Sequence, residues 1–222
     1  MMKKAVIFDM DGVLVNNNPW HIQAWITFAQ KYGLSITPEE VETHFGNTNR
    51  DYLTFLFGKE LPPDEVNKLA EEKEQIYRSL SEKFIQPLNG LIHFLHELKK
   101  YRFGIALATG GPLSNVQFIM DKLKSRHLFD VYVYDSMVKR GKPDPELFLK
   151  AAELLGAEPQ NCVVFEDSVH GIEAAIRASM IPIGINTSGK REKLKNASLV
   201  VNDFSEINVE KIIEMLNHRK DI

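Results

Sequence analysis

From residue 91 to the end of the chain, short apolar runs alternate with helical patterns. Strands are expected at residues 103–108, 131–134, 162–165, 182–185 and 199–201, and helices at 91–100, 113–123, 145–155, 169–178 and 209–216. A further apolar run, Ala-Val-Ile-Phe at residues 5–8, is short, continuous and rich in strand-forming residues. Such alternation predicts a parallel sheet with helices on both faces. We therefore expect a doubly wound α/β core.

The segment between the first strand and this alternation carries helical patterns and no strand pattern. Breaker clusters enclose it, Asn-Asn-Asn-Pro at residues 16–19 and Gln-Pro-Leu-Asn-Gly at residues 86–90. Helices are expected to begin at residues 20, 38, 51 and 62, with Thr37 as an N-cap for the second and residue 84 as the end of the last. The sequence thus predicts an all-helical domain at 17–87, inserted into a core formed by 1–16 and 88–222.

The composition of the chain limits the kinds of molecule and compartment that suit it. The chain is 44% apolar and 26% charged with a net charge of −3, so no basic excess attracts nucleic acid or anionic lipid. Cys162 is the single cysteine, which excludes an intramolecular disulfide and fits a reducing cytosol. The apolar run behind Lys4 ends at Phe8, too short for a signal peptide or a membrane span. We expect a cytoplasmic monomer without nucleic-acid or membrane partners.

Polar side chains gather where the predicted strands end. They occur in four places along the chain: Asp9-Met10-Asp11, Thr109-Gly110, Lys142 and Glu166-Asp167. In open parallel sheets, ligands bind outside the carboxyl ends of the strands, so we expect these groups to meet at one edge. Carboxylates so close together need a cation, a proton or solvent to relieve their repulsion. The sequence therefore predicts a site there.

The residue types at this edge favour a phosphate substrate. Carboxylates from separate strands form a hard-oxygen site suited to Mg²⁺, which keeps several waters and takes few protein carboxylates. Thr109 can donate to a phosphate oxygen, and Lys142 can neutralise a phosphoryl group and its nucleophile. The strand ends carry no histidine for zinc, and no serine–histidine pair is placed for acyl transfer.

Four ordered segments, DMDGVL, LATGG, KRGKPDPELF and VVFEDSVHGIEAA, resemble the four motifs of the haloacid dehalogenase superfamily. One short motif is a modest signal, but four in the right order are far stronger. The resemblance spans the predicted core. The helical insert is similar to the cap of the β-phosphoglucomutase-like branch, which closes over the site and selects the leaving group. The fold that this implies is a Rossmann-like core with a helical cap.

The resemblance also implies roles for the residues that bind and transfer phosphate. Asp9 would be the nucleophile that forms an aspartyl-phosphate, and Asp11 would be the general acid and base. Thr109 and Lys142 would hold the phosphoryl group, with Gly110 beside them as a substrate-binding residue. The small-molecule partner would be a phosphate ester.

For the metal, the resemblance implies a Mg²⁺ site. Asp9, the main-chain carbonyl of Asp11 and Asp167 would be its ligands, and Glu166 would either bind it or orient the other groups. Asp11 also separates two reaction types, because the alkoxide that leaves a phosphate ester needs a proton and a halide does not. Dehalogenases of the superfamily lack an acid at this position. Phosphoryl transfer is therefore expected.

Substrate-binding residues are also expected in the cap. The candidates are His21, Asn47, Arg50 and Lys73. A lone histidine on a helix is more often a surface or packing residue, but His21 stands where β-phosphoglucomutases have a histidine. The acidic run at residues 71–74 is interpreted as exposed surface.

The resemblance leaves a phosphatase and a mutase to be distinguished. Mutases place polar and basic residues after Thr109 to grip a second phosphate, whereas residues 110–113 here are Gly-Gly-Pro-Leu. The mutase cap arginine aligns with Asn49, and Arg50 points elsewhere on a helix. Hydrolysis of a small phosphate ester, a sugar phosphate, is the first interpretation. The alternative is a β-phosphoglucomutase that interconverts glucose 1-phosphate and glucose 6-phosphate. A catalytically silent binding protein is the third, against which the intact acids and lysine weigh.

Overall fold

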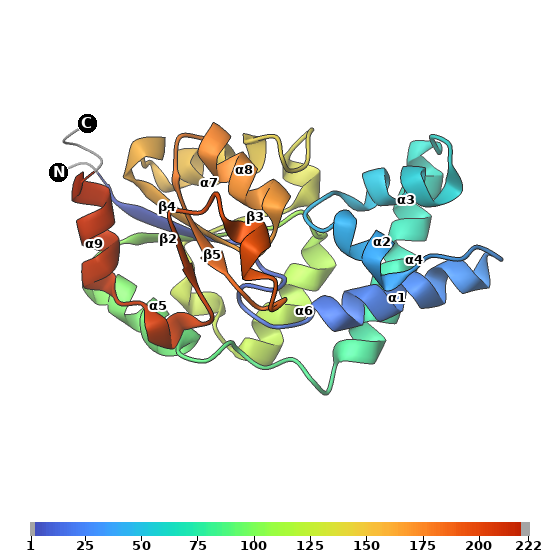
Figure 1. Ribbon diagram of the computed structural model, residues 1–222, viewed down its shortest axis with the longest axis horizontal. Helices are drawn as coiled ribbons and strands as arrows, with labels where there is room; N and C mark the ends of the chain where they lie inside the picture. Colours follow the sequence, from blue (N-terminus) through green and yellow to red (C-terminus); the bar gives the residue numbers. More distant parts are fainter. Residues whose placement is uncertain (1–2, 219–222) are drawn as a thin grey trace.

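Six parallel strands form one sheet in the order β3-β2-β1-β4-β5-β6 (Figure 1). The strands are β1 (Ala5–Phe8), β2 (Gly104–Ala108), β3 (Val131–Val133), β4 (Cys162–Glu166), β5 (Ile181–Ile185) and β6 (Leu199–Val201). This computed structural model describes residues 3–218, so the two ends of the predicted core, residues 1–2 and 219–222, lie outside the described residues.

Helices cover both faces of the sheet. They are α5 (Leu91–Lys100), α6 (Leu113–Leu123) and α9 (Val209–His218) on one face, and α7 (Glu146–Leu155) and α8 (Val169–Arg177) on the other. Val6 and Phe8 of β1 pack into the first apolar cluster, and Ala5 and Ile7 pack into the second. Because successive side chains of a strand point to opposite faces, burial on both sides explains the continuous apolar run. The predicted doubly wound α/β class is confirmed.

The register of the central strands creates the edge at which polar groups meet. Phe8 lies opposite Leu107 of β2 and opposite Phe165 of β4. The three strands therefore end nearly level, and the residues that follow them, among them Asp9 and Thr109, emerge on the same side of the sheet.

Four helices form a separate unit beyond this edge, which we call the cap (Figure 1). They are α1 (Asn18–Lys31), α2 (Pro38–Thr43), α3 (Asn49–Phe57) and α4 (Pro63–Ser81). The cap has its own apolar cluster, in which Trp25 and Phe28 of α1 pack against Leu53 of α3 and Leu69 of α4. Within the described residues, no helix has both the length and the apolar character needed to cross a membrane.

The two connections between core and cap run side by side. Val15 forms an antiparallel bridge with Pro87, and the N–H of Leu88 donates to the carbonyl of Leu14 at 2.9 Å. The expected domain limits, between residues 16 and 17 and between 87 and 88, lie next to this bridge. The limits themselves stay a prediction.

Several expected helix ends are shifted by one to three residues, among them the start of α1, which begins at Asn18 and not at residue 20. The helix expected to begin at residue 51 begins at Asn49, because Thr48 and Asp51 form a capping box that the sequence analysis did not use. The long helix α4 ends at Ser81 and not at residue 84. The position of each residue in α3 matters for the site, because the side chains of adjacent residues in a helix point about 100° apart.

Candidate active site

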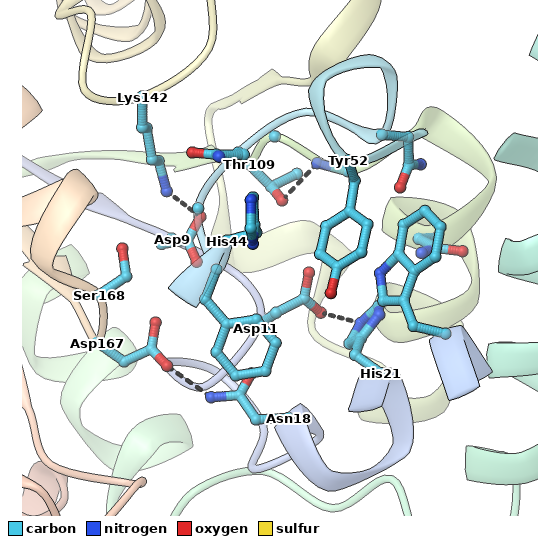
Figure 2. Close-up of a pocket in the computed structure, with 18 of the residues that line it drawn as sticks. Asp9, Asp11, Asn18, His21, His44, Tyr52, Thr109, Lys142, Asp167 and Ser168 are labelled. Carbon is cyan, nitrogen blue, oxygen red and sulfur yellow. Dashed lines mark hydrogen bonds and ion pairs between the residues drawn. The ribbon is translucent and has the colours of Figure 1, made fainter. Parts of the chain in front are cut away.

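A pocket lies between the carboxyl edge of the sheet and the cap (Figure 2). It brings together ten of the eleven predicted site residues: Asp9, Asp11, His21, Asn47, Lys73, Thr109, Gly110, Lys142, Glu166 and Asp167. The remaining one, Arg50, is exposed and lines a different cleft with Arg140. Its neighbour Asn49 lines both the pocket and this cleft.

Lys142 connects two of the acids in the floor of the pocket. Its Nζ donates to Asp9 Oδ1 at 2.7 Å and to Glu166 Oε1, and the lysine is only 4% exposed. Burial alone would lower the pKa of Lys142, but the two carboxylates outweigh it and raise that pKa above its ordinary value. The lysine is therefore a fixed positive charge beside Asp9.

Three acids form a cluster that could hold a metal ion. Asp9, Glu166 and Asp167 each offer an oxygen, and these oxygens lie within 4.8 Å of one another. Burial, together with the neighbouring carboxylates, raises the pKa of Asp9 to about 7 despite Lys142. The same causes raise the pKa of Asp167 well above its usual value. One lysine thus leaves negative charge uncompensated here, and a divalent cation fits that deficit.

Glu166 is held on both of its oxygens. Oε1 accepts from Lys142, and Oε2 accepts from the N–H of Ser168 at 2.7 Å. These bonds fix the carboxylate between the lysine and the start of α8. Of the two predicted alternatives for Glu166, its geometry favours the orienting one.

Two glycines leave room for these acids. A Cβ on Gly12, which has φ of +73°, would lie 2.0 Å from Asp167 Oδ2, and a Cβ on Gly171 would lie 1.9 Å from Glu166 Oε1. Both positions therefore require glycine for close approach, and Gly12 also for its left-handed backbone. This explains the glycine in DMDG and the glycine in VHGIEAA.

The strained acid cluster leads to a prediction on stability. We expect Asp167→Asn to raise the melting temperature of the metal-free protein by about 3 °C, roughly what 1 kcal/mol of relieved repulsion gives in a chain of this size. Added Mg²⁺ should raise the melting temperature of the wild type and not that of the variant. Differential scanning calorimetry measures both. The control is Asp121→Asn, at an exposed acid, which should change neither the melting temperature nor its response to Mg²⁺. A fall in melting temperature for Asp167→Asn would contradict the argument.

Asp11 lies in a different environment from Asp9. Its Oδ1 is 3.3 Å from His21 Nε2 and accepts from Asn17 Nδ2 at 2.5 Å. The His21 ring stacks on Tyr77, with 3.7 Å between ring centres, and the histidine is buried. Burial alone would raise the pKa of Asp11, but His21 and Asn17 lower it below its usual value. His21 is therefore in contact with a functional group, not a surface residue.

A line of polar contacts continues from His21 through the cap to the core. Lys73 Nζ lies 3.0 Å from His21 Nδ1 and donates to Glu74 Oε1 at 2.9 Å. Glu74 also accepts from Asn49 at 2.9 Å and from Asn115 of α6 at 2.7 Å. The interpretation of the acidic run as exposed surface is wrong for Glu74, which is 2% exposed.

The comparison with known families supports the sequence resemblance. The sequence model of the haloacid dehalogenase-like hydrolases matches residues 3–179. The chain belongs to this family. The predicted superfamily is thereby confirmed, together with the enzyme class of a phosphohydrolase.

This haloacid dehalogenase-like hydrolase is similar to proteins named as phosphatases and to a mutase. A phosphorylated carbohydrates phosphatase of Thermotoga maritima is 34% identical over 80% of this chain and 82% of its own. Hexitol phosphatase A of Escherichia coli is 33% identical over 95% and 96%. The crystal structure of β-phosphoglucomutase from Clostridium difficile superposes with a TM-score of 0.88 at 31% identity, covering 100% of both chains. The hydrolase thus belongs to the β-phosphoglucomutase-like branch.

Several pocket residues of the hydrolase were not among the predicted ones. They are Asn18, Trp25, His44, Asn49, Tyr52, Glu74, Asn115 and Ser168. Trp25 could have been found, because it lies four residues after His21 and so on the same helix face. Ser168 could also have been found, because it follows Asp167 in the fourth motif and caps α8. Most of the others depend on how the cap docks on the core, which no local pattern indicates.

Proposed function

We propose that this hydrolase is a Mg²⁺-dependent phosphatase of small sugar phosphates that works through an aspartyl-phosphate on Asp9. The observation that carries the proposal is the contrast between the two neighbouring acids. Asp9 is fixed by Lys142 and stands among the acid cluster, whereas Asp11 contacts His21 of the cap. A cation bound in the acid cluster would keep Asp9 ionised as the nucleophile, whereas Asp11 faces the cap side of the pocket, where it can pass a proton to and from the leaving oxygen.

The first step transfers the phosphoryl group to the protein. An oxygen of Asp9 attacks phosphorus, the ester P–O bond breaks, and Asp11 gives a proton to the leaving sugar oxygen. Lys142 and the hydroxyl of Thr109 stabilise the phosphoryl oxygens. In the second step water attacks phosphorus, Asp11 takes the proton of that water, and the bond to Asp9 breaks.

Asp9, the carbonyl of Asp11 and Asp167 would hold Mg²⁺, with Glu166 orienting the site. Bound there, the ion would neutralise charge on the phosphoryl group and on the nucleophile. This assignment is supported by the oxygen-only donor set and by the uncompensated charge of the cluster.

Sugar phosphates are the favoured substrates for two reasons. The two phosphatases reported above are named for phosphorylated carbohydrates and for hexitol phosphates. Aromatic and polar side chains also line the cap side of the pocket, which suits a hydroxylated leaving group. We further propose that the enzyme acts in the cytoplasm as a monomer, in keeping with its composition and single cysteine.

The test separates hydrolysis from mutase activity. We expect the enzyme to release phosphate from p-nitrophenyl phosphate and from sugar monophosphates with Mg²⁺, and to lose this activity when EDTA removes the metal. With β-glucose 1-phosphate and a bisphosphate activator, free phosphate should accumulate. Formation of glucose 6-phosphate without free phosphate would instead establish the mutase.

A further inference from the structure

The hydroxyl of Tyr52 is a buried polar group without a partner. Tyr52 is 3% exposed, its ring stacks on Trp25 with 3.9 Å between ring centres, and its hydroxyl points into the pocket (Figure 2). No group within residues 3–218 hydrogen-bonds to that hydroxyl. A buried hydroxyl without a partner is costly, so a bound molecule is the natural source of one. Burial also raises the Tyr52 pKa far above neutrality, so the group stays a hydroxyl.

Glu74 brings a negative charge to the same part of the pocket. Its carboxylate is buried beside Lys73 and accepts from Asn49 and Asn115. Burial alone would raise the pKa of Glu74, but the lysine, His21 and the amide of Asn115 lower it below its usual value. Glu74 is therefore ionised at neutral pH.

The charges in this part of the pocket balance. We call four cap residues, Trp25, Tyr52, Lys73 and Glu74, together with Asn115 of α6 the distal subsite, because they line the pocket outside the acid cluster. Lys73 is already paired with Glu74, and the other three residues are uncharged. A second phosphate or a carboxylate on the substrate would find no free cation there and would face an ionised acid. Hydroxyl groups would find donors, acceptors and the Trp25 ring.

We propose that the distal subsite selects an uncharged polyhydroxy leaving group and rejects a second anionic group, with Tyr52 and Glu74 as the specificity-determining residues. This inference rests on the proposed phosphatase activity and narrows its substrate class to sugar and sugar-alcohol monophosphates. Tyr52 hydrogen-bonds a substrate hydroxyl, and Glu74 accepts from hydroxyls while repelling carboxylates and phosphates.

A matched pair of substrates tests the charge rule. D-glucitol 6-phosphate and 6-phospho-D-gluconate share a carbon chain and differ at the far end, where one has a hydroxymethyl group and the other a carboxylate. We expect the wild type to prefer the glucitol ester by about 100-fold in kcat/KM, since placing like charges together costs several kcal/mol. Glu74→Gln should reduce this preference at least about tenfold, because Lys73 then meets the carboxylate unpaired. Glu72→Gln, on the same helix but bound to Lys31 outside the pocket, should keep it.

A second variant tests the hydroxyl contact. Tyr52→Phe keeps the ring on Trp25 and removes only the oxygen. We expect KM for D-glucitol 6-phosphate to rise about tenfold, the upper range for one hydrogen bond. Hydrolysis of p-nitrophenyl phosphate, whose leaving group has no alcoholic hydroxyl, should lose much less, so the ratio of the two losses measures the hydroxyl contact. Tyr32→Phe, at a tyrosine that binds Glu72 on the cap surface, is the matched control.

The outcomes separate the inference from the function on which it rests. If the enzyme released phosphate from none of the esters, the proposed phosphatase activity would be wrong. Equal kcat/KM for the two sugar esters, or an unchanged ratio in Glu74→Gln, would overturn the charge rule and leave the phosphatase standing. If Tyr52→Phe lost the same factor in kcat/KM on D-glucitol 6-phosphate and on p-nitrophenyl phosphate, the proposed hydrogen bond from Tyr52 to a substrate hydroxyl would be wrong. Thermal unfolding of each variant shows whether it is folded.

Discussion

Asp9→Asn is expected to lower kcat by at least about 10⁴-fold, because an amide cannot form the phosphoryl-enzyme bond. The substitution keeps the shape of the side chain and leaves Lys142 its bond to Glu166, so the pocket should stay intact. Steady-state release of phosphate from p-nitrophenyl phosphate and from a sugar phosphate measures the loss. Both substrates should be affected alike, since both pass through the same covalent step.

A trapping experiment separates loss of the nucleophile from loss of binding. Acid quenching of the wild type during turnover should yield phosphate attached to the protein with the lability of an acyl phosphate, and Asp9→Asn should yield none. Thr109→Ala serves as the comparison, because it weakens phosphate binding but keeps the nucleophile and should still be labelled. Robust turnover by Asp9→Asn would reject the covalent mechanism.

Asp11→Asn is expected to have an effect that depends on the leaving group. For a sugar phosphate, kcat/KM should fall by about 10³-fold, because the sugar alkoxide leaves without a proton. For p-nitrophenyl phosphate, whose phenolate is a much weaker base, kcat/KM should fall by about tenfold or less. This parameter reports the steps up to the phosphoryl-enzyme, so the later role of Asp11 as a base does not obscure the comparison.

Equal losses of Asp11→Asn on the sugar and aryl phosphates would contradict its role as the acid. If Asp11→Asn lost equal factors in kcat/KM on both substrates, Asp11 would act on substrate binding or on the shape of the site, and not on the leaving oxygen. Asp121→Asn, at an exposed acid paired with Arg126, is the control and should leave both values unchanged.

The core site was largely predictable from sequence because strand order and register do most of the positioning. Asp9 and Glu166 lie at the ends of neighbouring parallel strands, so a buried apolar run followed by an acid already places each one. Lys142 follows no strand, contrary to its expected place among the strand ends, and the motif resemblance was the better signal for it. Its contact with Asp9 depends on the path of the loop before α7, which has no local pattern.

The cap side of the site was much less predictable. Whether a helical residue faces the pocket depends on the start of its helix and on how that helix docks. In α3, Asn49 lines the pocket and the adjacent Arg50 does not, although Arg50 was the predicted residue. Glu74 resembled its charged neighbours in sequence, and only its contact with Asn115 of the core distinguishes it.

The bridge between the two core–cap connections affects when the contacts between cap and core form. Because Val15 and Pro87 are bridged, the two connections would move together in any rotation of the cap on the core. Such a rotation separates Glu74 from Asn115 and His21 from Asp11 at the same moment. The contact of Glu74 with Asn115 and the contact of His21 with Asp11 would therefore form together. An ester that kept the cap from docking on the core would therefore meet Asp11 without its contact to His21, before any bond to phosphorus is broken.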